Sequence, residues 1–342
     1  MRLKTLLRAL AAGAVVLVSG GARPHSPAVD VSAWTLIFPR PATGKYEDFA
    51  WVSDRQGWLV TARGDILHTT DGGVTWTSQA AGFFGLRSID FYDDKHGFAG
   101  SLQGKLYATT DGGATWNDIT STLPATAKGF CGITHVGKQV HIVGRYNLGS
   151  ADYFFSPDGG KTWEHTSLRD QAQGLVDVMF LNKDVGFIGG MGKSAQEGQS
   201  PALILKTTDG GKHWRPVFEH VGGRGFVWKL FPMSKKLIYA SLQSQDGVYR
   251  IAKTTDAGEH WDTLTVATGR PQGPGLQAVG FIDDNTGFVG GFHRTVYATT
   301  DGGKTWAEVS GIDLGLVNRF ERVGKTLITA GAKGVYRFDG NR

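Results

Sequence analysis

The stretch Thr69-Thr70-Asp71-Gly72-Gly73-Val74-Thr75-Trp76 decides the fold, because close copies of it recur along the chain. The copies, which we call boxes, share the pattern Ser/Thr-x-Asp-x-Gly-x-Thr/His-Trp, and successive tryptophans lie 40, 47, 51, 47 and 45 residues apart. A period near 45 residues is typical of a repeat architecture. The other five boxes occupy residues 109–116, 156–163, 207–214, 254–261 and 299–306.

Each box has the chemistry of a tight turn between two strands. The Asp carboxylate can accept hydrogen bonds from downstream N–H groups, and glycine supplies a positive φ. The tryptophan begins the next strand, where its ring can pack between sheets. Because folding alone explains six copies of one turn, we interpret the boxes as structural rather than as six catalytic or metal-binding carboxylates. The residues concerned are Asp71, Trp76, Asp111, Trp116, Asp158, Trp163, Asp209, Trp214, Asp256, Trp261, Asp301 and Trp306.

Each repeat follows a plan of four short strands, which is typical of a propeller blade. The stretch 31–38 resembles a strand that follows a box, with Trp34 in the tryptophan position, although no box precedes it. The end of the chain, 335–340, resembles a strand that enters a box and then stops. We therefore predict an all-β, seven-bladed β-propeller whose N-terminal strand completes the last blade, which removes an exposed sheet edge.

The first 22 residues differ from the rest of the chain. Arg2, Lys4 and Arg8 precede an apolar run, 9–18, and small residues follow it. This order is typical of a secretory signal peptide, and the run is short for a membrane span. We therefore predict a signal peptide at 1–22, a linker at 23–30 and a single propeller at 31–342, exported to the periplasm.

Composition argues against several functional classes. The formal net charge is +5, but without residues 1–22 the chain has 33 basic and 31 acidic residues, too small an excess to favour nucleic-acid binding. Cys131 is the chain's one cysteine, so no disulfide can form within the chain, and we expect a buried thiol. The histidines show no metal-site spacing. We expect no metal, no cofactor and a monomer.

The box resembles the Asp-box, or BNR repeat, of sialidases, sortilin-type receptors and other propellers. Segments such as Gly97-Phe98-Ala99-Gly100 followed by 106–116, and Gly287-Phe288-Val289-Gly290 followed by 297–306, extend the likeness. Over roughly residues 30 to 340 the chain is similar to the photosystem II stability/assembly factor family, lumenal seven-bladed proteins that bind newly made reaction-centre subunits. The resemblance implies a non-enzymatic, exported propeller that binds a subunit of a membrane protein complex or another protein, peripheral to the membrane at most. In a photosynthetic host the compartment would be the thylakoid lumen.

A basic face is the candidate partner surface. In a four-stranded blade, the turn between the second and third strands lies opposite the boxes, and the loops that lead into the first strands share that face. A ring of cations there could favour an acidic partner segment, although exposed turns are often charged and Asp65, Asp152, Glu197 and Asp246 share these turns. The turns carry Arg63, Lys105, Arg145, Lys193, Arg294 and Lys333, and the loops add Arg87, Lys128, Arg224 and Arg319.

Other residues suggest alternative roles. Asp48 and Asp177, on first strands, could point into the channel as paired carboxylates for a glycosidase, but polar residues commonly line such a channel. A sialidase-like or other Asp-box glycoside hydrolase is the alternative function, although the segment 38–41 lacks the isoleucine of the sialidase Arg-Ile-Pro motif and the chain has room for one propeller only. Exposed aromatics, at 83–84 or 153–154, could extend a protein-binding surface, although a core role for them is an alternative.

Overall fold

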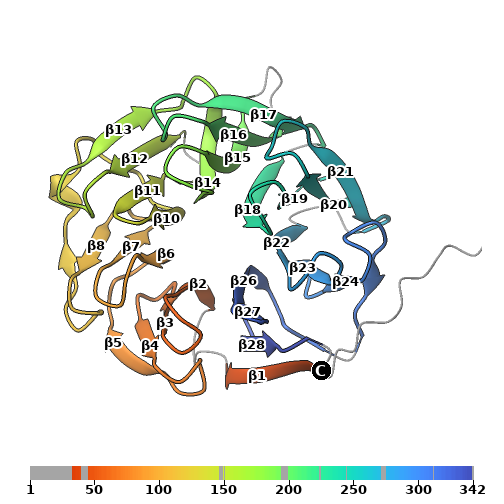
Figure 1. Cartoon of the computed structure of the whole chain (residues 1–342), viewed down its shortest axis with the longest axis horizontal. Helices are drawn as coiled ribbons and strands as arrows, with labels where there is room; N and C mark the ends of the chain where they lie inside the picture. Colours follow the sequence, from red (N-terminus) through yellow and green to blue (C-terminus); the bar gives the residue numbers. More distant parts are fainter. Residues whose placement is uncertain are drawn as a thin grey trace, which may run out of the picture.

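Seven four-stranded antiparallel sheets stand around a common axis as the blades of a ring (Figure 1). The computed structural model describes residues 33–39, 45–145, 149, 151–193, 199–222, 225–243, 245–270, 275–310 and 312–340. In six sheets, consecutive strands pair in chain order, and the first strand of each lies innermost. The predicted seven-bladed β-propeller is confirmed. The predicted signal peptide and linker lie outside the described residues.

Blades 1 to 4 take their strands in chain order. Blade 1 contains β2 (Tyr46–Trp51), β3 (Gly57–Thr61), β4 (Ile66–Thr69) and β5 (Thr77–Ala80). Blade 2 contains β6 (Leu86–Phe91), β7 (Gly97–Ser101), β8 (Leu106–Thr109) and β9 (Asn117–Asp118), followed by the short 3-10 helix η2 (Thr120–Thr122). Blade 3 contains β10 (Gly132–Val136), β11 (Gln139–Val143), β12 (Asp152–Ser156) and β13 (Glu164–Ser167). Blade 4 contains β14 (Ala172–Phe180), β15 (Gly186–Gly192), β16 (Ala202–Thr207) and β17 (Arg215–His220).

Blades 5 and 6 repeat this order, and blade 7 joins the two ends of the chain. Blade 5 contains β18 (Phe226–Pro232), β19 (Ile238–Gln243), β20 (Tyr249–Thr254) and β21 (Asp262–Ala267). Blade 6 contains β22 (Leu276–Phe281), β23 (Gly287–Gly291), β24 (Tyr297–Thr299) and β25 (Ala307–Glu308). Blade 7 contains β26 (Val317–Val323), β27 (Thr326–Gly331), β28 (Gly334–Phe338) and, outermost, β1 (Trp34–Pro39).

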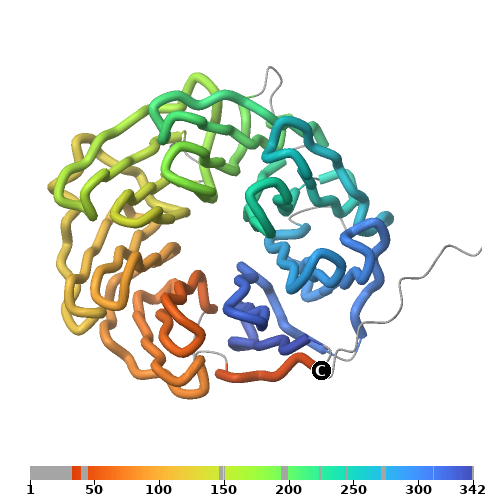
Figure 2. The backbone as a smooth tube through the Cα atoms, in the orientation of Figure 1, coloured from red at the N-terminus to blue at the C-terminus, as the bar shows by residue number. Residues whose placement is uncertain are grey.

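The ring closes through β1, as predicted. β1 pairs antiparallel with β28, with Trp34 opposite Phe338, and Figure 2 shows the red N-terminal segment running beside the blue C-terminal strands. The Trp34 ring is 7% exposed and its centroid lies 5.1 Å from that of Phe288 in blade 6. The N-terminal strand therefore supplies both the missing strand of blade 7 and the ring that packs against the preceding blade.

Each box folds as a local network of hydrogen bonds. In the first box, Asp71 accepts the Thr75 N–H at 2.9 Å and the Thr75 hydroxyl at 2.6 Å. The Thr69 hydroxyl donates to Asp71 at 2.8 Å and accepts the Gly73 N–H at 2.9 Å. Gly72 and Gly73 have φ values of 76° and 88°, a conformation that glycine adopts without a Cβ penalty. The carboxylate therefore has a role in folding at this turn.

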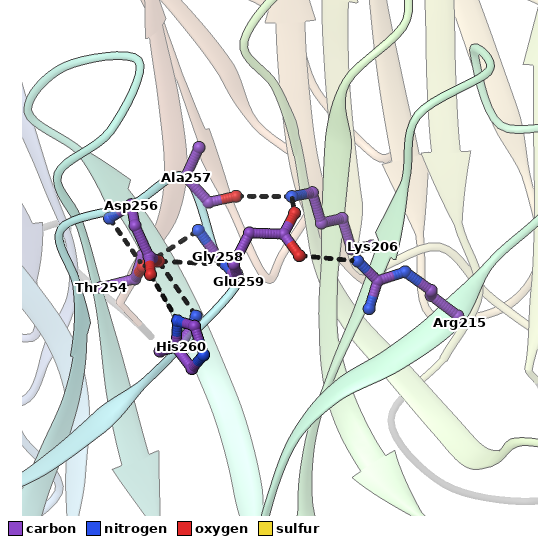
Figure 3. A network of polar contacts seen from close by, with 8 residues as sticks. All are labelled: Lys206, Arg215, Thr254, Asp256, Ala257, Gly258, Glu259 and His260. Carbon is purple, nitrogen blue, oxygen red and sulfur yellow. Dashed lines mark hydrogen bonds and ion pairs between the residues drawn. The ribbon is translucent and has the colours of Figure 1, made fainter.

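The boxes also join blades to one another. In the second box the Gly112 N–H donates to the Lys95 carbonyl of the same blade at 2.8 Å, and the Gly112 carbonyl accepts Trp58 Nε1–H of blade 1 at 3.1 Å. In the fifth box, Ala257 takes the glycine position with a φ of 61°, and its carbonyl accepts Lys206 Nζ–H of blade 4 at 2.8 Å (Figure 3). A single residue of the turn, through its N–H and its carbonyl, thus connects the second box to two other segments.

Aromatic rings fill the space between blades. Trp163 of blade 3 meets Phe98 of blade 2 edge to face, with centroids 5.8 Å apart, and Trp261 of blade 5 meets Phe187 of blade 4 in the same way at 6.3 Å. Full burial of a side chain of this size stabilises by roughly 1.5–3 kcal/mol. Cys131 is buried, as expected. The hydrophobic core thus lies between the blades and leaves the ring axis to polar side chains.

Candidate binding surface and central channel

The turns between second and third strands lie on the face opposite the boxes. In blade 1 this turn follows β3, and its Gly64 carbonyl accepts the Phe83 N–H at 3.2 Å from the loop that leads into blade 2. The Ala62 carbonyl accepts the Gly85 N–H at 2.9 Å. These bonds join the turn and the loop into one surface, whereas the box lies at the other end of β4. The chain direction therefore separates a box face from an opposite face.

Five of the predicted cations are exposed on this opposite face. Two more, Arg145 and Lys333, are half-buried there. We call these seven residues together the basic face. The exposed members are Arg63, Lys105, Lys128, Lys193 and Arg294.

Neighbouring carboxylates neutralise part of the basic face. Lys105 pairs with Asp118 at 2.7 Å, and Lys333 pairs with Asp313 at 3.2 Å. Arg145 donates to the Leu102 carbonyl at 3.1 Å. Within the described residues, no ion pair involves three exposed cations spread around the ring. These three are Arg63, Lys193 and Arg294.

Arg87 and Arg319 lie elsewhere than predicted. Arg87 is 4% exposed and donates to the Glu47 carbonyl at 3.2 Å, and its guanidinium lies 3.5 Å from the Glu47 carboxylate. Arg319 pairs with Asp48 at 3.0 Å. Both belong to innermost strands, so their side chains turn toward the ring axis instead of the solvent. They are channel residues and not part of the exposed basic face, whereas Arg224 lies outside the described residues.

Among the aromatic candidates, Phe84 alone offers a largely exposed ring. Its side chain is 69% exposed in the loop between β5 and β6, beside the turn that carries Arg63. The adjacent Phe83 packs on Tyr107, with ring centroids 4.3 Å apart. The alternative pair, Tyr153 and Phe154, is fully buried. An apolar ring next to an exposed cation is a feature of protein-binding surfaces.

The channel carboxylates are ion-paired. Asp48 is 1% exposed and accepts the Ile89 N–H of blade 2 at 3.3 Å, besides its pair with Arg319 of blade 7. Asp177 of blade 4 pairs with Lys229 of blade 5 at 3.1 Å and also accepts the backbone N–H of Leu230, the residue after Lys229. Both sit beside register shifts in their strands. Each carboxylate therefore links adjacent blades, a structural use that the sequence did not indicate.

Further charged residues in the channel were missed by sequence reasoning. Lys229, Glu321 and Arg322 line a cavity in the channel together with Asp177 and Arg319. The alternation of polar and apolar residues in β26, with Arg319 and Glu321 flanking Phe320, could have indicated that these two side chains share one face. Burial raises the pKa of Glu321 to about 7.

Two further properties concern metals and membranes. Across the described ranges, no group of three or more His, Cys, Asp or Glu side chains is placed to hold a metal ion. In the same ranges, no helix has the length and apolar character needed to span a membrane.

Comparisons with known proteins identify the fold. No protein-family model and no curated protein matches the chain. A structure of YCF48 bound to D1 peptide superposes with a TM-score of 0.65 at 17% identity, covering 93% of this chain and all of that one. YCF48 from Cyanidioschyzon merolae gives 0.65 at 19% identity, covering 89% and 98%. The GH74 xyloglucanase from Xanthomonas campestris gives 0.63 at 14% identity, covering 89% of this chain and 53% of that one. The YCF48 matches agree with the resemblance noted in the sequence.

Proposed function

We propose that this chain is an exported, non-enzymatic propeller that binds a protein through its basic face and assists the assembly or stability of a membrane protein complex. The observation that carries the proposal is the set of exposed cations without ion pairs in the described structure, Arg63, Lys193 and Arg294, on the face opposite the boxes. The signal-like residues 1–22 support export to the periplasm, or to the thylakoid lumen in a photosynthetic host.

Electrostatics and local chemistry favour a protein partner with an acidic segment. Cations on one face attract such a segment over roughly a Debye length, which speeds encounter more than it strengthens the final complex. The exposed Phe84 ring beside Arg63 supplies apolar contact area that long-range charge does not provide. The similarity to YCF48, a photosystem II assembly factor solved with a D1 peptide, supports peptide binding by a propeller of this shape.

The experiment is a capture assay on detergent-solubilised membranes of the native host. The mature chain is compared with a variant that combines Arg63→Glu, Lys193→Glu and Arg294→Glu. A control variant combines Lys161→Glu, Lys212→Glu and Lys304→Glu, which changes the net charge equally but on the box face, where all three lysines are exposed. We expect a membrane protein subunit that the wild type and the control retain and the first variant loses.

Loss of the subunit in both variants would show that net charge alone governs retention and would refute the assignment to the basic face. Equal retention by all three proteins would do the same. Thermal unfolding of each variant checks that the compared proteins are folded.

A glycoside hydrolase is the second candidate, favoured by the superposition on the GH74 xyloglucanase and by the raised pKa of Glu321. A carboxyl group with a pKa near 7 suits a general acid. However, Asp48 and Asp177 are each paired with a cation, which leaves them poorly suited to act as nucleophile or base. Turnover of a xyloglucan or sialoside that Glu321→Gln abolishes would establish this candidate in place of the binding function.

A further inference from the structure

A cavity of about 260 Å³ opens in the channel at the box face. Its position follows from β18, which ends at Pro232 in the cavity wall. In the turn after that strand, the Lys236 carbonyl accepts the Ala257 N–H at 3.0 Å. The turn therefore adjoins the box of the same blade. The charged side chains that line the cavity are Asp177, Lys229, Arg319, Glu321 and Arg322.

Hydrogen-bond donors exceed acceptors in this wall. Lys229 donates one hydrogen bond to Asp177, and Arg319 donates one to Asp48. An ammonium group has three N–H donors, whereas a guanidinium has five. Arg322 is exposed, and its guanidinium lies 4.0 Å from the Met233 sulfur. No carboxylate of the described part of the chain forms an ion pair with Arg322. The remaining N–H donors of the cavity wall can therefore bind an additional group that carries acceptor oxygens.

Glu321 adds an unusual acceptor to the same wall. Its side chain is 24% exposed, its Oε2 has no hydrogen-bond donor among the residues that the structure describes, and Arg319 Nε lies 3.5 Å away. Burial raises the pKa of Glu321 to about 7. Near neutral pH a large fraction of these carboxyl groups is therefore protonated, and the O–H can donate to an anion. The charged or titratable groups around it are Arg319 on its own strand, Asp48 on β2, Asp90 on β6, His135 on β10, Asp177 on β14 and Lys229 on β18.

We propose that this cavity binds a small carboxylate anion, held by Arg322, Arg319 and Lys229. The protonated Glu321 carboxyl donates a further hydrogen bond to the anion. A planar carboxylate matches the fork of a guanidinium, and a cavity of about 260 Å³ has room for a small organic acid. The site lies on the face opposite the proposed partner surface, so it does not rest on the proposed function.

Binding in this site is expected to strengthen as the pH falls through about 7. Above that pH the ionised Glu321 repels a second carboxylate, whereas below it the group is neutral and donates. The fraction of protonated Glu321 falls about tenfold between pH 6 and pH 8 for a pKa of about 7, and the apparent affinity follows the competent fraction. Two sources carry this chemistry, namely a free acid and the C-terminus of a chain.

The experiment is calorimetric titration of the folded full chain with three probes, succinate, N-acetylglycine and N-acetylglycinamide, at pH 6 and pH 8. The amide lacks the carboxylate and serves as the ligand control. Arg322→Gln removes the exposed cation of the site, and Lys325→Gln removes an exposed cation of the adjacent turn that does not line the cavity. Glu321→Gln keeps the shape of the side chain and removes its titration.

We expect carboxylate binding at pH 6 that weakens about tenfold at pH 8, weakens on the order of tenfold in Arg322→Gln and stays within about twofold in Lys325→Gln. Glu321→Gln should bind at both pH values alike. Preference for succinate indicates a free acid, and equal binding of N-acetylglycine indicates a chain terminus. Absence of binding at pH 6, equal binding of the amide, equal effects of Arg322→Gln and Lys325→Gln, or an unchanged pH dependence in Glu321→Gln would each overturn the proposal.

Discussion

The Arg319 guanidinium lies 3.0 Å from the Asp48 carboxylate, and this ion pair joins the last blade to the first. Asp48 is almost fully buried, and it also accepts the Ile89 N–H of blade 2. One carboxylate therefore contacts both blades that flank its own. The closure of the ring depends on this contact at the axis as well as on the outer strand β1.

Neutralising Asp48 should destabilise the ring at this junction. Asp48→Asn leaves the Arg319 cation without its closest partner inside the channel, and breaking such a pair costs several kcal/mol. Because Arg319 remains 28% exposed and near Glu321, we expect the free energy of unfolding to fall by only roughly 2–3 kcal/mol. The free energy of unfolding is measured by urea denaturation. The exposed Asp54→Asn is the control and should change it by less than about 0.5 kcal/mol; equal effects of the two substitutions would contradict the role of the pair.

The boxes should make the protein sensitive to acid. The Thr75 hydroxyl and N–H lower the pKa of Asp71 to about 2, from an ordinary value of 3.8, and Thr115 acts in the same way on Asp111. Because the folded pKa is depressed, this stabilisation is complete above the unfolded pKa and is lost as the pH falls through the folded value. We expect the urea midpoint to fall between about pH 4 and pH 2. An Asp71→Asn, Asp111→Asn variant should show a shallower decline, and an unchanged slope would rule out this contribution.

The junction of blades 4 and 5 should depend on Lys206 more than on Glu259. Lys206 is 4% exposed, donates to the Ala257 carbonyl at 2.8 Å and pairs with Glu259, which also accepts Arg215 (Figure 3). Lys206→Met leaves the Ala257 carbonyl without this donor, at a cost of about 1–3 kcal/mol. Glu259→Gln keeps an amide oxygen that can accept a hydrogen bond from Lys206 and removes the charge of a side chain that is 53% exposed, so we expect a smaller loss of about 1 kcal/mol. Urea denaturation of both variants checks this order, and the reverse order would refute it.

Phe84 should matter for binding and not for folding. Since its ring is 69% exposed, Phe84→Ala should leave the free energy of unfolding within about 0.5 kcal/mol of the wild type. Under the proposed function it should weaken capture of the partner by on the order of tenfold, as loss of an interface anchor does. Val74→Ala removes another exposed apolar side chain, 59% exposed in the first box, and serves as the control. If the two substitutions weaken capture equally, Phe84 is not an anchor.

The number of blades, the closure by the N-terminal strand and the turn chemistry of the boxes could all be predicted from the amino-acid sequence. These features are local, because each box carboxylate bonds to groups two to four residues away and glycine sets the turn. The contacts between distant segments could not be predicted in this way, because sequence spacing does not encode them. Arg319 meets Asp48 across 271 positions, and strand register turned Arg87 inward, although its loop position predicted exposure. The cavity beside Glu321 likewise exists only once blades 4 to 7 meet at the axis, because side chains distant in the chain become neighbours only through the closed ring.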